Sequence, residues 1–136
     1  MAEQTIIPYL TVKDGAGAIA FYQKAFGATE NMRMPAQDGK RLMHASLTIN
    51  GGTLFLSDEF PEYGNAAAPK AGDKPSVAVA LALPAPANVD STYKQAVAAG
   101  ATGTMEPEDA FWGDRFAMLQ DPYGHRWMLS APLKKG

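Results

Sequence analysis

The chain has 136 residues and a formal net charge of -2, with 46% hydrophobic and 19% charged residues. These values are typical of one globular domain over residues 1–136 and argue against an intrinsically disordered chain. The small net charge gives no electrostatic reason to expect a nucleic acid or an anionic membrane as a partner.

Two features that the sequence lacks, cysteine and a long apolar segment, exclude further classes of site and of protein. The chain has no cysteine, which excludes disulfides, thiolate zinc sites and cysteine nucleophiles. The N-terminal sequence MAEQTIIPYL lacks the basic and apolar regions of a signal peptide, and no apolar run approaches the roughly 20 residues of a membrane span. We therefore expect a cytoplasmic protein with no membrane partner.

The first half of the chain, residues 5–58, predicts one strand, one helix and three more strands. The sequence TIIPYLTV (5–12) is rich in β-branched residues, which is typical of a strand. Asp14 can cap a helix that ends at Gly27, where a left-handed backbone is expected. The apolar stripe of this helix is Ala18, Ile19, Tyr22, Ala25 and Phe26. Further strands are expected near 28–34, 41–49 and 52–58, with a tight NGG hairpin between the last two.

The second half, residues 76–131, repeats the same order of elements. SVAVALAL (76–83) predicts a strand, and a helix that ends at Gly100 follows it. Its apolar face would consist of Val89, Tyr93, Ala96 and Val97. Strands are then expected near 101–106, 115–120 and 125–131. The segment between the halves, 59–75, is rich in Pro, Gly and Ala and predicts a surface linker or a lid over a site.

Matching landmarks indicate that the chain is an internal duplication. The offset between the halves stays at 71–74 residues for four pairs: Tyr22 and Tyr93, Gly27 and Gly100, Gly39 and Gly113, Ser57 and Ser130. The sequence therefore predicts an α+β fold of two tandem βαβββ modules. We expect them to form a curved mixed sheet around a cleft, with the helices on the outer face.

The sequence DPYGHRW (121–127) holds one of the two histidines of the chain. Asp121, Pro122 and Gly124 suit the first, second and last positions of a tight turn, so we interpret DPYGH as a turn and not as a metal-ligand set. His125 would then begin the last strand. Because side chains alternate along a strand, Trp127 and Leu129 should pack under a helix while Met128 points to the opposite face.

At this point the sequence resembles a known family. The paired βαβββ units, AIAFYQKAFGA and DPYGHRW are similar to the vicinal oxygen chelate superfamily, which includes glyoxalase I, extradiol dioxygenases and bleomycin-binding proteins. RLMHASLTINGGTLFLSDE and FWGDRFAMLQDPYGHRWML look closest to a phosphonate-operon-associated, demethylubiquinone methyltransferase-like subgroup. The resemblance does not imply methyl transfer, because the sequence has no Gly-rich nucleotide-binding loop.

The resemblance implies a set of metal-ligand positions that this chain does not fill. Metal-dependent members use His, Gln or Glu on the first and last strands of each module. Here these positions hold Met128, its repeat partner Phe55, Ile7, and Val77 or Val79. Divalent Zn, Mn and Fe need nitrogen or oxygen donors, so we expect no metal ion and no cofactor.

The alternation of strands 41–49 and 52–58 predicts which side chains face the cleft. Met43, Ala45, Leu47, Ile49, Leu54 and Leu56 would lie under the helix. The opposite face would carry Tyr9, Thr11, Leu42, His44, Ser46, Thr48, Thr53, Phe55 and Ser57. From these, from the second module and from the loop before it we select as candidate ligand-binding residues Tyr9, Thr11, His44, Ser46, Phe55, Ser57, Trp112, Arg115 and Met128.

Three of these candidates have a structural alternative. His44 is the candidate catalytic group because imidazole can accept or donate a proton near neutral pH, with Asp58 as an optional partner. It could equally be a hydrogen-bonded histidine on a wetted strand. Trp112 and Arg115 could contact an anionic or aromatic ligand, or serve as a packing residue and as a partner of Asp109 or Asp114.

Two functions remain open at this level. The first is a metal-free protein that binds a small planar or aromatic molecule in the cleft. The alternative is a lyase, isomerase or dioxygenase-type enzyme that uses His44 or a metal held in another way. The resemblance also implies a homodimer in which modules could pair within or between chains.

Overall fold

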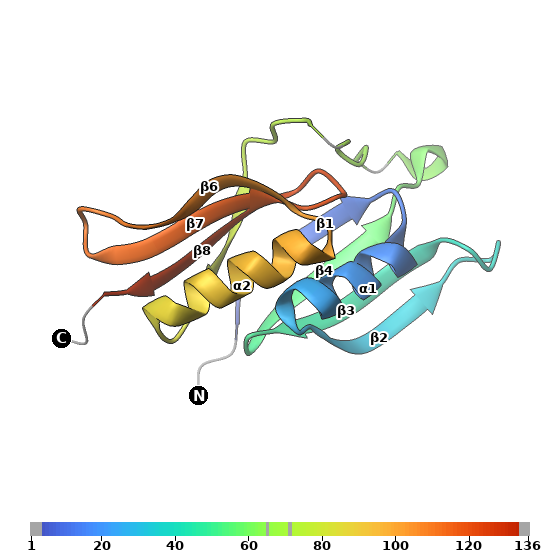
Figure 1. Ribbon diagram of the computed structural model, residues 1–136. Helices are drawn as coiled ribbons and strands as arrows, with labels where there is room; N and C mark the ends of the chain where they lie inside the picture. Colours follow the sequence, from blue (N-terminus) through green and yellow to red (C-terminus); the bar gives the residue numbers. More distant parts are fainter. Residues whose placement is uncertain (1–3, 65, 71, 134–136) are drawn as a thin grey trace.

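The computed structural model describes residues 4–64, 66–70 and 72–133 and contains two βαβββ modules (Figure 1). The first module consists of β1 (Tyr9–Val12), α1 (Gly15–Phe26), β2 (Thr29–Pro35), β3 (Leu42–Ile49) and β4 (Gly52–Asp58). A short 3-10 turn, η1 (Pro61–Tyr63), follows it. The second module consists of β5 (Ala78–Ala82), α2 (Pro86–Ala99), β6 (Thr102–Asp109), β7 (Asp114–Gln120) and β8 (Arg126–Pro132).

Each module forms its own four-stranded mixed sheet. Sheet A has the order β1-β4-β3-β2 and sheet B has the equivalent order β5-β8-β7-β6. The first strand of each module pairs in parallel with the last, and the other pairs are antiparallel. The predicted α+β class and the two modules are confirmed. Within the described residues no strand pair joins the two sheets, so the expected curved sheet is divided in two.

Local sequence signals set the ends of α1 and the turn between β3 and β4 as predicted. The Asp14 carboxylate accepts a hydrogen bond from the Gly17 amide at the start of α1, and Gly27 ends the helix with a left-handed backbone (φ 69°). Asn50 and Gly51 both have positive φ (50° and 82°), which suits the tight turn between β3 and β4.

Three details differ from the prediction. β1 begins at Tyr9 and not at Thr5. Met43, expected under the helix, is exposed, whereas Leu42 is buried. The reason is a β-bulge: consecutive residues of β2 pair with His44 and Leu42, which leaves Met43 as the extra residue. Val97 of α2 is also exposed to solvent and does not join the helix face predicted for it.

The two helices lie side by side, each against its own sheet (Figure 1). The Gln95 amide of α2 donates to the Lys24 carbonyl of α1 at 2.7 Å. α1 also reaches the second module, because the rings of Tyr22 and Phe26 pack 5.3 and 4.7 Å from the Trp127 ring of β8. Trp127 is fully buried, as predicted, and joins both modules in one hydrophobic core.

The DPYG sequence forms the predicted turn, and its aspartate binds across the seam between the modules. The Asp121 carboxylate, 2% exposed, accepts hydrogen bonds from the Tyr22 hydroxyl (2.5 Å) and the Trp127 indole (2.8 Å). It also accepts from the amides of Tyr123 and His125. The His125 ring donates through Nε2 to the Thr11 carbonyl of the first module at 2.8 Å. Both groups therefore fix one module against the other.

Neither helix, in the part of the chain that the structure describes, has the length and apolarity needed to cross a membrane.

Tyr22→Phe should lower the free energy of unfolding by about 1–3 kcal/mol, because the buried Asp121 carboxylate loses a donor. Burial, with the Asp121 charge second, raises the pKa of Tyr22 well above its usual value of about 10. The stability that this phenol contributes is complete below about pH 10 and is lost as pH rises beyond it. Urea unfolding should therefore show a wild-type advantage that shrinks at strongly alkaline pH.

The exposed Tyr63 offers a matched control, since Tyr63→Phe removes the same hydroxyl from the surface. Equal stability of wild type and Tyr22→Phe at pH 7 would contradict this role of the Tyr22–Asp121 hydrogen bond.

Candidate functional site

Each sheet has one face under a helix and one face turned away from it, which we call its open face. On sheet A the strand registers place Tyr9, Phe55, Ser46 and Met32 in one row across the open face. The equivalent row of sheet B is Ala80, Met128, Met118 and Met105. The repeated topology thus produces two similar surfaces with different chemistry: aromatic and polar on sheet A, methionine-rich on sheet B.

Three aromatic side chains meet on the open face of sheet A. The Tyr9 hydroxyl and His44 Nδ1 lie 2.9 Å apart and share a hydrogen bond. The Phe55 ring packs edge-on against both, with centroids 5.7 Å from Tyr9 and 4.7 Å from His44. Tyr9 is 54% exposed, so the cluster is open to a ligand. The sequence placed these residues on one face but did not identify Tyr9 as the partner of His44.

Polar groups flank this aromatic cluster. The Asn31 amide of β2 donates to the hydroxyls of Ser46 and Thr48 at 3.2 and 3.0 Å. Thr11 and Ser57 are neighbours on β1 and β4, but Ser57 is largely buried and donates its hydroxyl to the Asp58 carbonyl. The candidate residues of the first module therefore lie together, with Ser57 the least accessible.

Beside the cluster lies a wall formed by Arg41, its acidic partners and Phe60, which the sequence did not predict. The Arg41 guanidinium forms a bidentate ion pair with Glu62, binds Asp38, and lies 4.3 Å from the centre of the Phe60 ring. The Lys40 amide, followed by the Arg41 amide and side chain, lowers the pKa of Asp38 to about 2, so this carboxylate stays ionised. Arg41 thereby ties the η1 turn to the β2–β3 connection.

The Phe60 end of this wall borders an open cavity of about 350 Å³. Phe60 and Tyr63 stack with centroids 5.8 Å apart and form one side. The remaining lining residues are Tyr9, Thr11, Met43 and Ser57. The exposed Met43, placed here by the β-bulge, is therefore a candidate contact that the strand pattern had assigned to the core.

On sheet B, two candidates lie at the open face and one does not. Met128 is half-buried between Ala80 and Met118. Trp112, in the β6–β7 connection, packs its ring 5.0 Å from Phe116, whose strand position faces the open side with Ser130. Both residues belong to the second module, and no ring contact among the described residues joins Trp112 to the Tyr9–His44–Phe55 cluster.

Arg115 and Asp58 are engaged in structural contacts. The Arg115 guanidinium forms a bidentate pair with Asp90 of α2, at 2.5 and 2.9 Å, and also binds Asp109. It thus lies on the helix side of sheet B. Asp58 is 3% exposed and accepts hydrogen bonds from the Gly15 and Leu42 amides. It fixes the start of α1 and is not the partner of His44.

The positions that would bear metal ligands carry no suitable donor set. Next to Met128 on β5 is Ala80, while Val79 pairs with Trp127 on the buried side, which corrects the expected Val77 or Val79. On sheet A the corresponding neighbours are Phe55 and Tyr9. Among the described residues, no three or more His, Cys, Asp or Glu side chains converge. These residues do not fit a divalent cation.

Comparisons with known proteins agree with this architecture. The chain is 41% identical over 135 residues to the uncharacterized protein Mb0911c of Mycobacterium bovis, covering 98% of this chain and 86% of that protein. TioX from Micromonospora sp. ML1 has a similar fold, with a TM-score of 0.71, 24% identity, and 98% and 99% of the two chains covered.

The PhnB protein from Bacillus cereus is also similar in fold, with a TM-score of 0.71 at 20% identity over 94% of this chain and 99% of that one. A family model describing the Glyoxalase/Bleomycin resistance protein/Dioxygenase superfamily matches residues 5–129. With two βαβββ modules and a match over nearly its whole length, the chain belongs to this superfamily.

Proposed function

We propose that the protein binds a small organic molecule with a planar aromatic part on the open face of sheet A. The observation that carries the proposal is the exposed cluster of Tyr9, His44 and Phe55, which offers ring faces and one hydrogen-bonding pair. Aromatic walls around a few polar groups are typical of small-molecule sites. The adjoining cavity, walled by Phe60 and Tyr63, supplies depth.

A reaction assisted by His44 is the second candidate, and the Tyr9–His44 hydrogen bond is the observation that favours it. If the Tyr9 hydroxyl donates to Nδ1, Nε2 carries the ring proton; if Nδ1 donates, Nε2 is free to act as a base. Binding remains the main proposal because Asp58, the carboxylate expected beside His44, is bound to two backbone amides instead.

We propose further that a second copy of the chain completes the site. Both open faces expose large apolar side chains, among them Met32, Met34 and Met43 on sheet A and Met105 and Trp112 in the second module. Extended exposed apolar surfaces on a folded chain usually mark interfaces. A two-fold axis would place sheet B of one chain opposite sheet A of its partner and bring Trp112 and Met128 to the ligand.

We propose that, within the superfamily, the chain belongs to the phosphonate-operon-associated, demethylubiquinone methyltransferase-like subgroup and acts in the cytoplasm. The fold that it shares with the PhnB protein at 20% identity is compatible with this subgroup.

Phe55→Ala should weaken binding of acridine, a planar heteroaromatic probe, by about tenfold or more, because a buried ring contact contributes at least about 1.4 kcal/mol. Fluorescence titration at pH 8, where acridine is uncharged, measures the dissociation constant. Val97→Ala, on the solvent side of α2, is the control and should bind as the wild type does. The proposed site is refuted if acridine does not saturate the wild type, or if Phe55→Ala binds acridine with the same dissociation constant as the wild type.

The same samples test the catalytic alternative. Mass spectrometry of compounds that copurify or are recovered after incubation should show them unaltered if the protein only binds. A product formed by the wild type but not by His44→Gln would favour catalysis instead.

Light scattering during size-exclusion chromatography should give twice the mass of one chain. Trp112→Glu should shift the population to monomer, because the interface would have to bury an unpaired carboxylate. Val97→Glu adds the same charge on the helix side and should remain dimeric. A wild-type monomer at about 100 μM would contradict the paired faces, since typical specific interfaces associate below micromolar concentrations.

Mn²⁺, Zn²⁺ or Ni²⁺ added to the purified protein should not be retained after dialysis, because the aligned positions are Tyr9, Phe55, Ala80 and Met128. Elemental analysis measures metal per chain. One equivalent retained by the wild type and lost in His44→Ala would show a metal site centred on His44 and would revive the metal-dependent alternative.

A further inference from the structure

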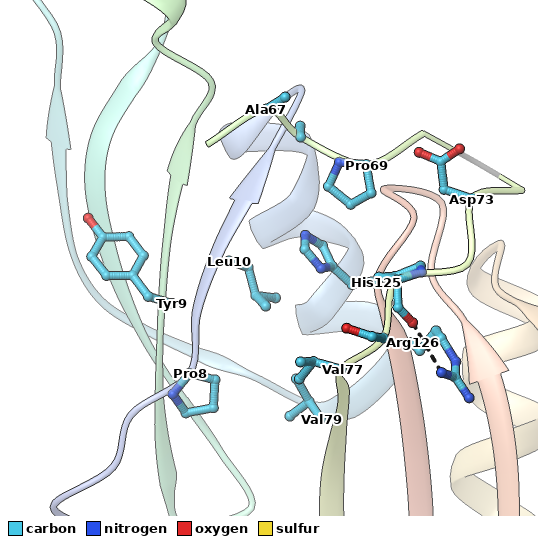
Figure 2. Close-up of a pocket in the computed structure, with 13 residues that line it drawn as sticks. Pro8, Tyr9, Leu10, Ala67, Pro69, Asp73, Val77, Val79, His125 and Arg126 are labelled. Atoms are coloured by element: carbon cyan, nitrogen blue, oxygen red, sulfur yellow. Dashed lines mark hydrogen bonds between the residues drawn. The ribbon is translucent and has the colours of Figure 1, made fainter. Parts of the chain in front are cut away.

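A second cavity, of about 560 Å³, lies at the seam between the modules (Figure 2). Its walls come from β1, the segment between the modules, the start of β5 and the residues that open β8. The volume falls within the range of about 300–1,000 Å³ that is usual for small-molecule sites. In Figure 2 the Tyr9 ring lies on the other side of β1 from Leu10 and His125; Tyr9 lines this cavity too, whereas His44 and Phe55 do not.

Described residues of the segment between the modules, namely 67–69, 73 and 75, form the roof of the cavity, and specific contacts hold them there. The Ala68 amide donates to the Glu59 carboxylate at 2.7 Å, and the Gln120 side chain donates to the Asp73 carbonyl at 2.6 Å. At Gly124 a Cβ atom would lie 2.7 Å from the Lys70 carbonyl oxygen, so glycine permits the close approach. The roof is therefore a fixed part of the fold, and the cavity is preformed.

Among the residues that the structure describes, Arg126 in this cavity is the arginine that has no carboxylate partner. Arg33, Arg41 and Arg115 each bind a carboxylate. Arg126 donates only from one terminal nitrogen, Nη1, to the Pro75 carbonyl at 3.1 Å, marked by the dashed line in Figure 2. Within the described chain its Nε and Nη2 donors have no protein acceptor. A guanidinium with free donors in a largely apolar cavity suits a carboxylate.

The other polar groups of the cavity restrict the charge of a ligand. The His125 ring donates through Nε2 to the Thr11 carbonyl, which leaves Nδ1 without a protein partner in the described structure. Asp73, on the roof, already accepts the Lys70 amide and would repel additional negative charge. Apart from the hydroxyls of Tyr9 and Ser76, the remaining lining side chains are apolar and include Leu10, Val77 and Val79. A single negative charge and an apolar body match these surroundings.

We propose that this cavity binds a small organic monocarboxylate whose carboxylate pairs with Arg126 and whose ring or branched apolar body packs against β1 and β5. The site goes beyond the proposed function, because it uses neither Phe55 nor His44. It is assembled from both modules and the segment that joins them.

Calorimetric titration of the full chain with 2-naphthoate tests the proposal. The wild type should bind one equivalent per chain, and the uncharged 2-naphthamide should bind at least about tenfold more weakly, since a charge-assisted bond is lost. Arg126→Gln should lose about tenfold or more in affinity for 2-naphthoate while Arg126→Lys keeps part of it. Arg33→Gln, on the exposed β2 strand, is the matched control and should leave the affinity unchanged.

Two further variants and one spectroscopic measurement make each outcome decisive. Gly124→Ala should weaken 2-naphthoate binding because it displaces the roof of the cavity. In NMR spectra, the methyl resonances of Val77 and Val79 should shift when 2-naphthoate binds in the cavity. Phe55→Ala should leave 2-naphthoate binding intact; loss of acridine binding alone would then leave this site standing. The proposal is overturned if 2-naphthoate does not saturate the wild type, or if Arg126→Gln binds 2-naphthoate as tightly as the wild type. It is also overturned if Phe55→Ala loses 2-naphthoate binding together with Arg126→Gln. If Arg126→Gln does not fold, equal affinity of the wild type for 2-naphthoate and 2-naphthamide overturns it.

Discussion

The arrangement of the two modules depends on one buried carboxylate. Asp121 directly follows β7. Its carboxylate accepts hydrogen bonds from the Tyr22 hydroxyl of the other module, from the Trp127 indole and from two amides of its own turn. A buried carboxylate is costly unless its oxygens are bonded, so its donors must all be present together. This requirement aligns α1 with β8 and brings the two helices into contact.

The position of the helices decides where ligands can bind. α1 and α2 pack against each other and cover one side of each sheet. Side chains that could bind a ligand therefore lie on the opposite sides of the sheets and at the seam between the modules. The open side of sheet A carries hydrogen-bonding aromatics, whereas that of sheet B carries methionines, which adapt their shape to varied apolar surfaces. The seam differs because it holds the Arg126 guanidinium, which forms no ion pair with any carboxylate of the described residues.

Local signals in the sequence predicted most of the fold. The Asp14 cap, the Gly27 stop, the turn at Asn50 and the alternation around Trp127 follow from residue chemistry within a few positions. The β-bulge at Met43 was not predictable, because it depends on how β2 pairs with β3. The same limit applies to the site: Tyr9 and His44 are 35 residues apart, and Arg41 reaches Glu62 from 21 residues away. For Arg115 the sequence offered a ligand or a neighbouring aspartate as partner, and the Asp109 pair is present; the Asp90 pair was missed because Asp90 comes from a distant helix.

The alternation of side chains along each strand has a consequence for how such a chain can change over time. On β8 the odd-numbered residues from Trp127 to Ala131 are buried, while Met128 and Ser130 between them are not. Selection for folding therefore acts on the buried, odd-numbered residues of the strand, and selection for ligand binding acts on the even-numbered residues between them. After an ancestral duplication, the two copies could keep an identical architecture while their outward surfaces diverged almost independently.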